Sequence, residues 1–518
     1  MKYRILAVMA AGVLLTGAIQ AQTAYEAAKL SQKDLNGTAR FVGMGGAMGA
    51  LGGDISTIST NPAGIGLFRK ADIMITAGFD QNTLDMGGFN ESATRARLNN
   101  VGLVVPFKVN ETGILRSFNL AFNYQRRNSF YKNISLDRLL PADWVSQTYQ
   151  MTQQADGADK DLLSFSDDKD YNPLWNQEIG WLTILGYNAG LIEEVGNNKY
   201  DQTDSYDRYQ FNSYERGGID QSEFNLSFNL NDRFYIGATL GFYNVDYTKN
   251  TDYTELKTVM NTDVGYTLYS DNWIHGEGVN FKLGAIVRPF EESSFRLGFA
   301  VHTPIYYKLT LTTGSEIFTQ YLNTEGELAN RDFSTYDNLE GNGSMDRDFR
   351  LRTPWLFNLS TGYTIGNNIA LGAEYEYEDY ASSNLQDYTG RGLSVENGQM
   401  KNILKGVHTL RLGAEVKLMP EVAFRVGYNY SSAAFHKNAR KELKYNSLST
   451  NTDFTNQESQ NIITAGVGVR LTSNLYLDMA YKYSGQNGQF YPFDDSKLPP
   501  VKQTNSTHSF LATLGFRF

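Results

Sequence analysis

Residues that could carry out chemistry are few and scattered in this chain of 518 residues. The chain has no cysteine, which excludes a disulfide framework, a thiolate metal site and a lipidated cysteine. No Ser-His-Asp arrangement can be placed, and the acidic residues are spread across predicted loops. We therefore expect no enzyme, no catalytic residue, no metal site and no cofactor. The histidines lack the spacing of metal or haem ligands, and they are His275, His302, His408, His436 and His508.

A glycine-rich stretch near the N-terminus suggests a different chemistry. Residues 43–48 read Gly-Met-Gly-Gly-Ala-Met, which is similar to the glycine pattern of a dinucleotide-binding loop. Such a loop needs a strand before it and a βαβ unit around it, and neither is indicated here. A nucleic-acid partner is also disfavoured, because the net charge is −10. We infer that these glycines allow close packing of the backbone in a confined space.

Composition and the first residues indicate an exported, folded protein. With 33 Tyr and 30 Phe, the chain has far more aromatic residues than a disordered protein. Lys2 and Arg4 precede an apolar run over residues 5–19, and Ala21 is a plausible last residue before a cleavage site. This layout predicts a secretory signal peptide over residues 1–21. No later segment is long and apolar enough for a membrane-spanning helix.

From Ala71 onward, apolar and polar residues alternate with the period of two that is typical of β-strands. We expect an all-β fold with an even number of strands, as a closed bacterial barrel requires. The fourteen strands that we predict span residues 72–80, 98–107, 116–125, 222–230, 233–247, 277–288, 294–303, 354–364, 368–380, 407–418, 421–431, 461–471, 474–484 and 508–518.

The predicted connections alternate between short turns and long loops, the longest being loop 126–221. This alternation is the signature of an antiparallel transmembrane β-barrel of the outer membrane. Residues 510–518 alternate and end in an aromatic residue, which resembles the last strand that the outer-membrane assembly machinery recognises in barrel proteins. The face opposite the apolar one is charged, and we expect most of its residues to form pairs in the lumen. They are Glu374, Glu376, Glu378, Arg411, Glu415, Lys417, Arg425, Arg470, Asp478, Lys482 and Arg517.

Residues 22–70 do not alternate and are predicted to fold back into the lumen as a plug. Residues 37–69 carry the element Asn61-Pro62-Ala63-Gly64. This stretch resembles the hatch of the outer-membrane long-chain fatty-acid and aromatic-hydrocarbon transporter family, in the form found in Bacteroidota. The resemblance implies a fourteen-stranded barrel, residues 71–518, plugged by an N-terminal hatch. It also implies that a hydrophobic solute is captured outside and leaves sideways through a break in the wall after the hatch moves.

Loop 126–221 contains an apolar stretch that could receive such a solute. Residues 173–192 predict a short amphipathic helix. Alternatively, the same residues form the loop's own small core. Pro106 is one candidate for the wall break, because proline cannot donate to a strand ladder. The predicted hydrophobic capture surface consists of Trp175, Ile179, Trp181, Leu182 and Leu185.

The leading functional hypothesis is passive transport of a fatty acid-like hydrophobic small molecule across a Gram-negative outer membrane. The expected partners are the solute, outer-membrane lipid and the assembly machinery, and we expect a monomer and no nucleic acid. An alternative is a barrel that holds exported protein cargo in a Bacteroidota secretion system. A general polar porin would fit the charged lumen but not the plug.

Overall fold

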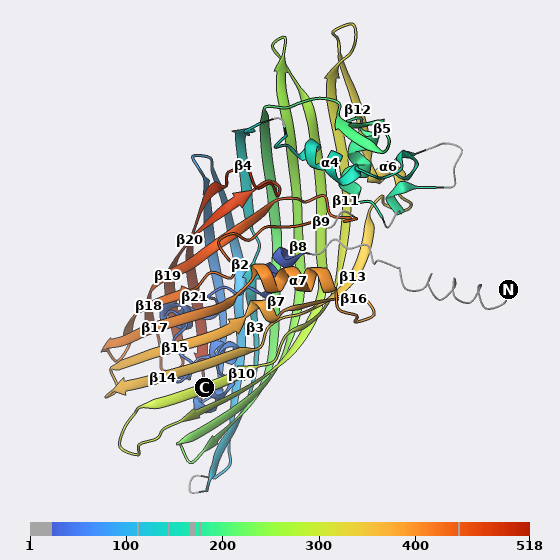
Figure 1. Ribbon diagram of the computed structural model, residues 1–518. Helices are drawn as coiled ribbons and strands as arrows, with labels where there is room; N and C mark the ends of the chain where they lie inside the picture. The colour runs from blue at the N-terminus through green and yellow to red at the C-terminus, as the bar shows by residue number, and fades with distance from the viewer. Residues whose placement is uncertain (1–22, 111–112, 143, 166–170, 176–177, 444–445) are drawn as a thin grey trace, which may run out of the picture.

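The computed structural model describes residues 23–110, 113–142, 144–165, 171–175, 178–443 and 446–518. The predicted signal peptide therefore lies outside the described residues. Figure 1 shows a tall barrel with the first described segment, in blue, inside it and short helices at one end. None of the described helices is long and apolar enough to cross a membrane.

The strands of the wall form one antiparallel sheet that closes on itself through β1 and β21. Nineteen strands belong to this sheet, and two of them, β4 and β12, lie outside the ring. Six others form three wall strands, each made of two consecutive segments: β10 with β11, β13 with β14, and β15 with β16. The wall thus has fourteen strands, which confirms the predicted fold class. Their bounds are β1 Asp72–Met86, β2 Asn90–Lys108, β3 Leu115–Ser129, β4 Lys132–Leu139, β7 Arg208–Leu230, β8 Phe234–Val259, β9 Thr262–Val287, β10 Arg296–His302, β11 Tyr306–Leu322, β12 Leu328–Ser334, β13 Met345–Arg352, β14 Leu356–Ile365, β15 Ile369–Asp379, β16 Asn384–Asp387, β17 Gly406–Met419, β18 Val422–Ser431, β19 Phe454–Arg470, β20 Leu475–Tyr491 and β21 Val501–Arg517.

The register places apolar side chains outside and charges inside. Ile73, Ile75 and Phe79 of β1 are exposed on the outer face, as are Leu514 and Phe510 of the neighbouring β21. Such a continuous apolar exterior is typical of a transmembrane barrel. Inside, the predicted charges pair across strands, as the sequence led us to expect: Arg411 with Glu374 and Glu376, Arg425 with Glu415 and Asp478, and Arg517 with Asp72.

Many wall strands are longer at one end than the sequence predicted. Residues 248–276, expected as a loop, continue β8 and β9 as a hairpin that turns at Met260 and Asn261. Both turn residues have positive φ, 51° and 64°, as a tight two-residue hairpin turn requires. The reason for the error is physical. Beyond the bilayer a strand can be polar on both faces, so the alternation that marks it disappears.

The region predicted as loop 126–221 contains several short elements that pack over one end of the barrel (Figure 1). The predicted helix over 173–192 is shorter in the structure, where α5 covers eight residues. The short elements outside the wall are η3 Lys160–Leu162, η4 Pro173–Trp175, α4 Gln147–Ala155, α5 Trp181–Asn188, the hairpin β5 Ile192–Gly196 with β6 Lys199–Gln202, α6 Thr335–Asn338 and α7 Ser394–Ile403, and the turn η5 Tyr380–Ser382 lies within the wall between β15 and β16.

The N-terminal segment, residues 23–70, lies within the barrel and is almost wholly buried. We call it the hatch segment. It forms α2 Ala24–Ser31, α3 Ala39–Gly43, η1 Ile55–Ser59 and η2 Pro62–Leu67. Its side chains and backbone bond to the inner face of distant strands: Ala39 N donates to Thr513 at 2.7 Å, and Gly49 N donates to Glu374 at 3.0 Å.

A row of glycines on four neighbouring strands receives the glycine-rich part of the hatch segment. The row runs in register through Gly362, Gly372, Gly413 and Gly427. A Cβ on Gly372 would lie 2.0 Å from the carbonyl oxygen of Ala47, so no larger residue fits without displacing the hatch backbone. The glycines of residues 43–53 and those of the wall therefore allow two backbones to approach each other closely.

Candidate functional site

The barrel wall is interrupted at one level across three adjacent strands. Residues 303–305 separate β10 from β11, residues 353–355 separate β13 from β14, and the turn η5 separates β15 from β16. His302 pairs with Leu356, and Tyr306 pairs with Arg352. We call this interruption the wall break.

Two prolines lie at the centre of the wall break. The pairing of β10 with β14 and the pairing of β11 with β13 have the same register, and this register places Pro304 opposite Pro354. Neither has an N–H group, so neither can donate a hydrogen bond to the other. The ladder resumes where Thr353 N donates to Ile305 O at 3.1 Å. Pro106, the candidate suggested by the sequence, does not break the wall, because β2 continues through it paired with Asn119.

Aromatic side chains line the two faces of the wall break. Trp355 and Tyr306 are exposed on the outer face, which contacts lipid in a transmembrane barrel. Tyr307 and Tyr380 are 1% and 4% exposed and lie on the inner side. The hydroxyl of Tyr307 is buried and has no hydrogen-bond partner among the described residues.

A polar cavity of about 250 Å³ lies in the lumen beside the wall break, with Tyr380 and Glu378 in its lining. Eight Lys and Arg side chains line it, against six Asp and Glu. Several of these charges are paired, such as Lys33 with Glu376 and Glu378. The cavity is therefore polar and carries a small excess of positive charge.

Besides Lys482, which donates to the carbonyl of Leu35 at 3.0 Å, three cations of this cavity have no acidic partner within ion-pair distance among the described residues. Arg127 donates to the carbonyl of Ser31 at 3.3 Å, Lys132 donates to Gln503 at 3.3 Å, and Arg95 lies over the ring of Tyr131 at 4.1 Å. Burial lowers the pKa of Lys132, which lies in β4 beyond the wall strands, to about 8. Sequence reasoning missed these residues, because they come from polar strand ends that were predicted as loops.

The predicted hatch motif lies against the wall close to the wall break. Asn61 caps η2 by accepting from Ala63 N at 3.1 Å, and it donates to the carbonyl of Ala285 in β9 at 3.2 Å. A Cβ on Gly237 would lie 2.4 Å from Pro62 O, so the motif packs directly on backbone. The motif residues Asn61, Pro62, Ala63 and Gly64 are all buried.

The residues predicted as a capture surface divide into two groups. Trp175 is 52% exposed. The other four predicted residues are at most 5% exposed. They belong to a large apolar core that also contains residues of α2 and of the wall strands, and they are Ile179, Trp181, Leu182 and Leu185. The indole N–H of Trp181 donates to the carbonyl of Leu174 at 3.0 Å. In this conformation Trp175 alone of the five presents a large apolar surface to the outside.

The described residues contain no group of three or more His, Asp or Glu side chains placed to hold a metal ion. No protein-family model and no curated protein matches this chain in sequence. Among solved structures, the fold is similar to that of a Pseudomonas aeruginosa FadL homologue, with a TM-score of 0.52 and 13% identity over 94% of this chain and 100% of that one. It is also similar to the deltaS2 mutant of the TodX monoaromatic hydrocarbon channel, with a TM-score of 0.50 and 9% identity over 94% and 100% of the two chains. At these identities the likeness establishes the fold alone, which is a closed fourteen-stranded antiparallel β-barrel.

Proposed function

We propose that this protein carries hydrophobic solutes, such as long-chain fatty acids, passively across a Gram-negative outer membrane. The observation that carries the proposal is the wall break between Pro304 and Pro354, beside a lumen occupied by the hatch segment. Each methylene moved from water to an apolar phase gains about 0.8 kcal/mol, so an acyl chain prefers a path into the bilayer to one into the periplasm. The names of the two similar structures, a FadL homologue and a hydrocarbon channel, agree with this class of solute.

Transport would proceed by extracellular capture, movement of the hatch segment and lateral release. Trp175 supplies exposed apolar surface for capture, and Ile179, Trp181, Leu182 and Leu185 would become accessible only after the extracellular loops open. Movement of the hatch segment would then open a path through the lumen cavity towards the wall break. Asn61 to Gly64 would control this step, and their contacts with β8 and β9 support that role.

The charge of the lumen cavity favours an amphipathic anion over a neutral hydrocarbon. Arg95, Arg127 and Lys132 lack acidic partners among the described residues and can hold a carboxylate. The acyl chain would occupy the aromatic inner side of the wall break, near Tyr307 and Tyr380. This arrangement would place the charged head in the polar cavity and the chain towards the lipid.

Uptake measurements test the proposal. We would compare a long-chain fatty acid with toluene in proteoliposomes that contain wild type, a deletion of residues 38–66, or Trp175→Ala. We expect saturable fatty-acid uptake in wild type, altered uptake in the deletion and weaker capture in Trp175→Ala. Uptake in wild type no faster than in vesicles with an unrelated barrel would contradict the proposed function.

The proposal places the barrel in the outer membrane as a monomer. β21 would carry the signal for the assembly machinery, since it alternates, ends near Phe518 and closes the ring with β1. Outer-membrane lipid would contact the apolar exterior, including Trp355 at the wall break.

A second candidate is a barrel that holds exported protein cargo. The observation that favours it is a set of large exposed apolar side chains in the region 126–221 and at the turn of the β8–β9 hairpin: Leu139, Trp144, Trp175, Val195 and Met260. If this candidate is correct, replacing these five residues by serine stops secretion of a passenger protein and leaves fatty-acid uptake unchanged.

A further inference from the structure

The connection between β18 and β19, which is described over residues 432–443 and 446–453, crosses the inside of the barrel. We call it the crossing loop. Asp453 pairs with Lys249 of β8 at 2.6 Å, and Thr450 shares hydrogen bonds of 2.6 Å with Ser270 of β9 and Ser315 of β11. These strands lie across the barrel from β18 in the strand order. The crossing loop is therefore fixed to the far wall and covers the lumen on the side that the proposed function makes extracellular.

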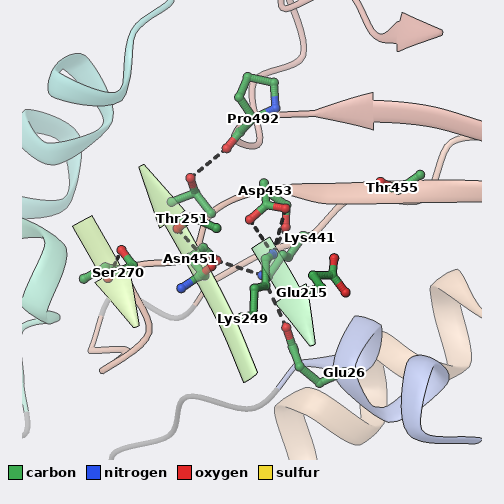
Figure 2. Close-up of polar contacts among 12 residues, drawn as sticks. Glu26, Glu215, Lys249, Thr251, Ser270, Lys441, Asn451, Asp453, Thr455 and Pro492 are labelled. Atoms are coloured by element: carbon green, nitrogen blue, oxygen red, sulfur yellow. Dashed lines mark hydrogen bonds and ion pairs between the residues drawn. The ribbon is translucent and has the colours of Figure 1, made fainter. Parts of the chain in front are cut away.

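Helix α2 of the hatch segment is joined to the crossing loop at its N-terminal end. Lys441 reaches Glu26 at 3.5 Å and donates to the carbonyls of Asn451 at 2.7 Å and Asp453 at 3.2 Å (Figure 2). Tyr25 stacks on Phe435 of the crossing loop with ring centroids 4.7 Å apart. Burial alone would raise the pKa of Glu26, but Lys441 reverses the effect, so the carboxylate stays charged.

The C-terminal end of α2 is joined to the wall break. The carbonyl of Ser31 accepts from the hydroxyl of Tyr380 in η5 at 3.4 Å and from Arg127 of β3 at 3.3 Å. Just beyond the helix, Lys33 pairs with Glu376 and Glu378 at the end of β15. An eight-residue helix of about 12 Å thus connects the extracellular cover to the interrupted wall strand.

We propose that α2 couples the crossing loop to the wall break, so that displacing the loop from Glu26 loosens Tyr380 and opens the wall. Since η5 interrupts β15 and β16, Tyr380 depends on contacts inside the barrel rather than on the strand ladder. Lys441 holds both the fold of the crossing loop and the end of α2, so a solute that moves the loop also removes the partner of Glu26. The inference rests on the proposed function for its biological meaning. The coupling itself needs no solute, so it can be measured in solute-free protein.

The test uses a single-cysteine reporter, which is clean because the chain has no cysteine. Ser383 adjoins η5 and is buried, and its hydroxyl has no hydrogen-bond partner among the described residues. We would measure the rate at which a maleimide labels Ser383→Cys in solute-free proteoliposomes. Glu26→Gln and Lys441→Met should each raise the labelling rate about tenfold, the size of effect typical of a broken coupling. The double variant should raise it by much less than the product of the two single effects.

Two controls separate coupling from local damage. The hydroxyl of Thr23 caps α2 by accepting from Tyr25 N at 3.3 Å and donates to Glu26, so Thr23→Ala weakens the cap of α2 and leaves Lys441 untouched. Lys257→Met removes an ion pair with Asp204 at the extracellular edge, away from α2. Both controls should label at the wild-type rate. Gel mobility with and without heating would first show that both variants are folded barrels. Equal labelling rates in Lys441→Met and Lys257→Met would then overturn the coupling.

Uptake distinguishes this failure from failure of the proposed function. If Glu26→Gln and Lys441→Met label faster but no variant takes up fatty acid, the coupling stands and the transport proposal falls. If wild type takes up fatty acid and labelling is the same in all variants, transport stands and the coupling falls.

Discussion

Pro304 and Pro354 face each other across two neighbouring strands of the barrel wall, 50 residues apart in the sequence. Neither residue can donate a hydrogen bond to the other, so the ladder lacks two donors where they meet. The same level carries η5 in the next strand, where Tyr380 turns into the lumen. This is the only wall interruption across three adjacent strands among the described residues.

Restoring the missing donors should close the wall. The double variant Pro304→Thr and Pro354→Thr supplies two N–H groups, each worth about 1 kcal/mol in a completed ladder. We expect slower fatty-acid uptake and a higher melting temperature, measured in proteoliposomes and by circular dichroism. Pro106→Thr is the matched control, because β2 is continuous at that proline. Unchanged uptake in the double variant would exclude the wall break as the exit.

The glycine row should be needed to hold the hatch segment in the lumen. Gly372→Leu places side-chain atoms where the carbonyl of Ala47 lies, 2.0 Å from the Cβ position. We expect the hatch segment to move and the ion conductance of single barrels in planar bilayers to rise. Gly398 of α7 has open space around its Cβ position, so Gly398→Ala should conduct as wild type does. A closed Gly372→Leu barrel would show that this contact does not hold the plug.

Fatty-acid binding should weaken as the pH rises through about 8. Burial lowers the pKa of Lys132 to about 8 from its usual value near 10.5, so the side chain loses its charge as the pH passes that point. We expect the dissociation constant of a fluorescent fatty acid to increase between pH 7 and pH 9.5. Lys132→Arg, which stays charged, should bind equally at both values. The same pH change in Lys132→Arg would assign the effect to another group.

The free energy of unfolding should change in the opposite direction with pH. Between pH 8 and the unfolded pKa near 10.5, the unfolded chain binds more protons at Lys132 than the folded chain does. Stability therefore rises with pH in this window, and the gain is absent below about pH 8. Urea unfolding would measure this effect in wild type and in Lys132→Met at pH 7.5 and pH 10. The free energy of unfolding of wild type should rise relative to that of Lys132→Met between the two pH values.

Substitutions of two tryptophans should separate a role in solute capture from a role in core packing. Trp181 is fully buried, so Trp181→Ala should lower the free energy of unfolding by about 3–5 kcal/mol. Trp175 is half exposed, so Trp175→Ala should leave stability near wild type and weaken fatty-acid capture. Chemical denaturation and initial uptake rates provide the two measurements. Wild-type capture by a stable Trp175→Ala barrel would remove the proposed role of this side chain.

The sequence by itself determined the wall. Lipid on one side and a polar lumen on the other impose a period of two, and that period is visible in segments such as 224–230 and 410–417. It also separated the hatch segment from the wall, because residues 22–70 do not alternate. Strand ends beyond the bilayer lost this constraint, so the hairpin of β8 and β9 was predicted as a loop.

Only the tertiary structure decided what the lumen contains and where the wall opens. Pro304 meets Pro354, Gly372 meets Ala47, and Glu26 meets Lys441 because of strand register and chain folding, and no local pattern encodes these pairs. The apolar stretch around Trp181 illustrates the same point, since its composition suits a capture surface and a core equally well. Burial depends on which distant residues pack against a side chain, and that is a property of the folded chain rather than of the segment.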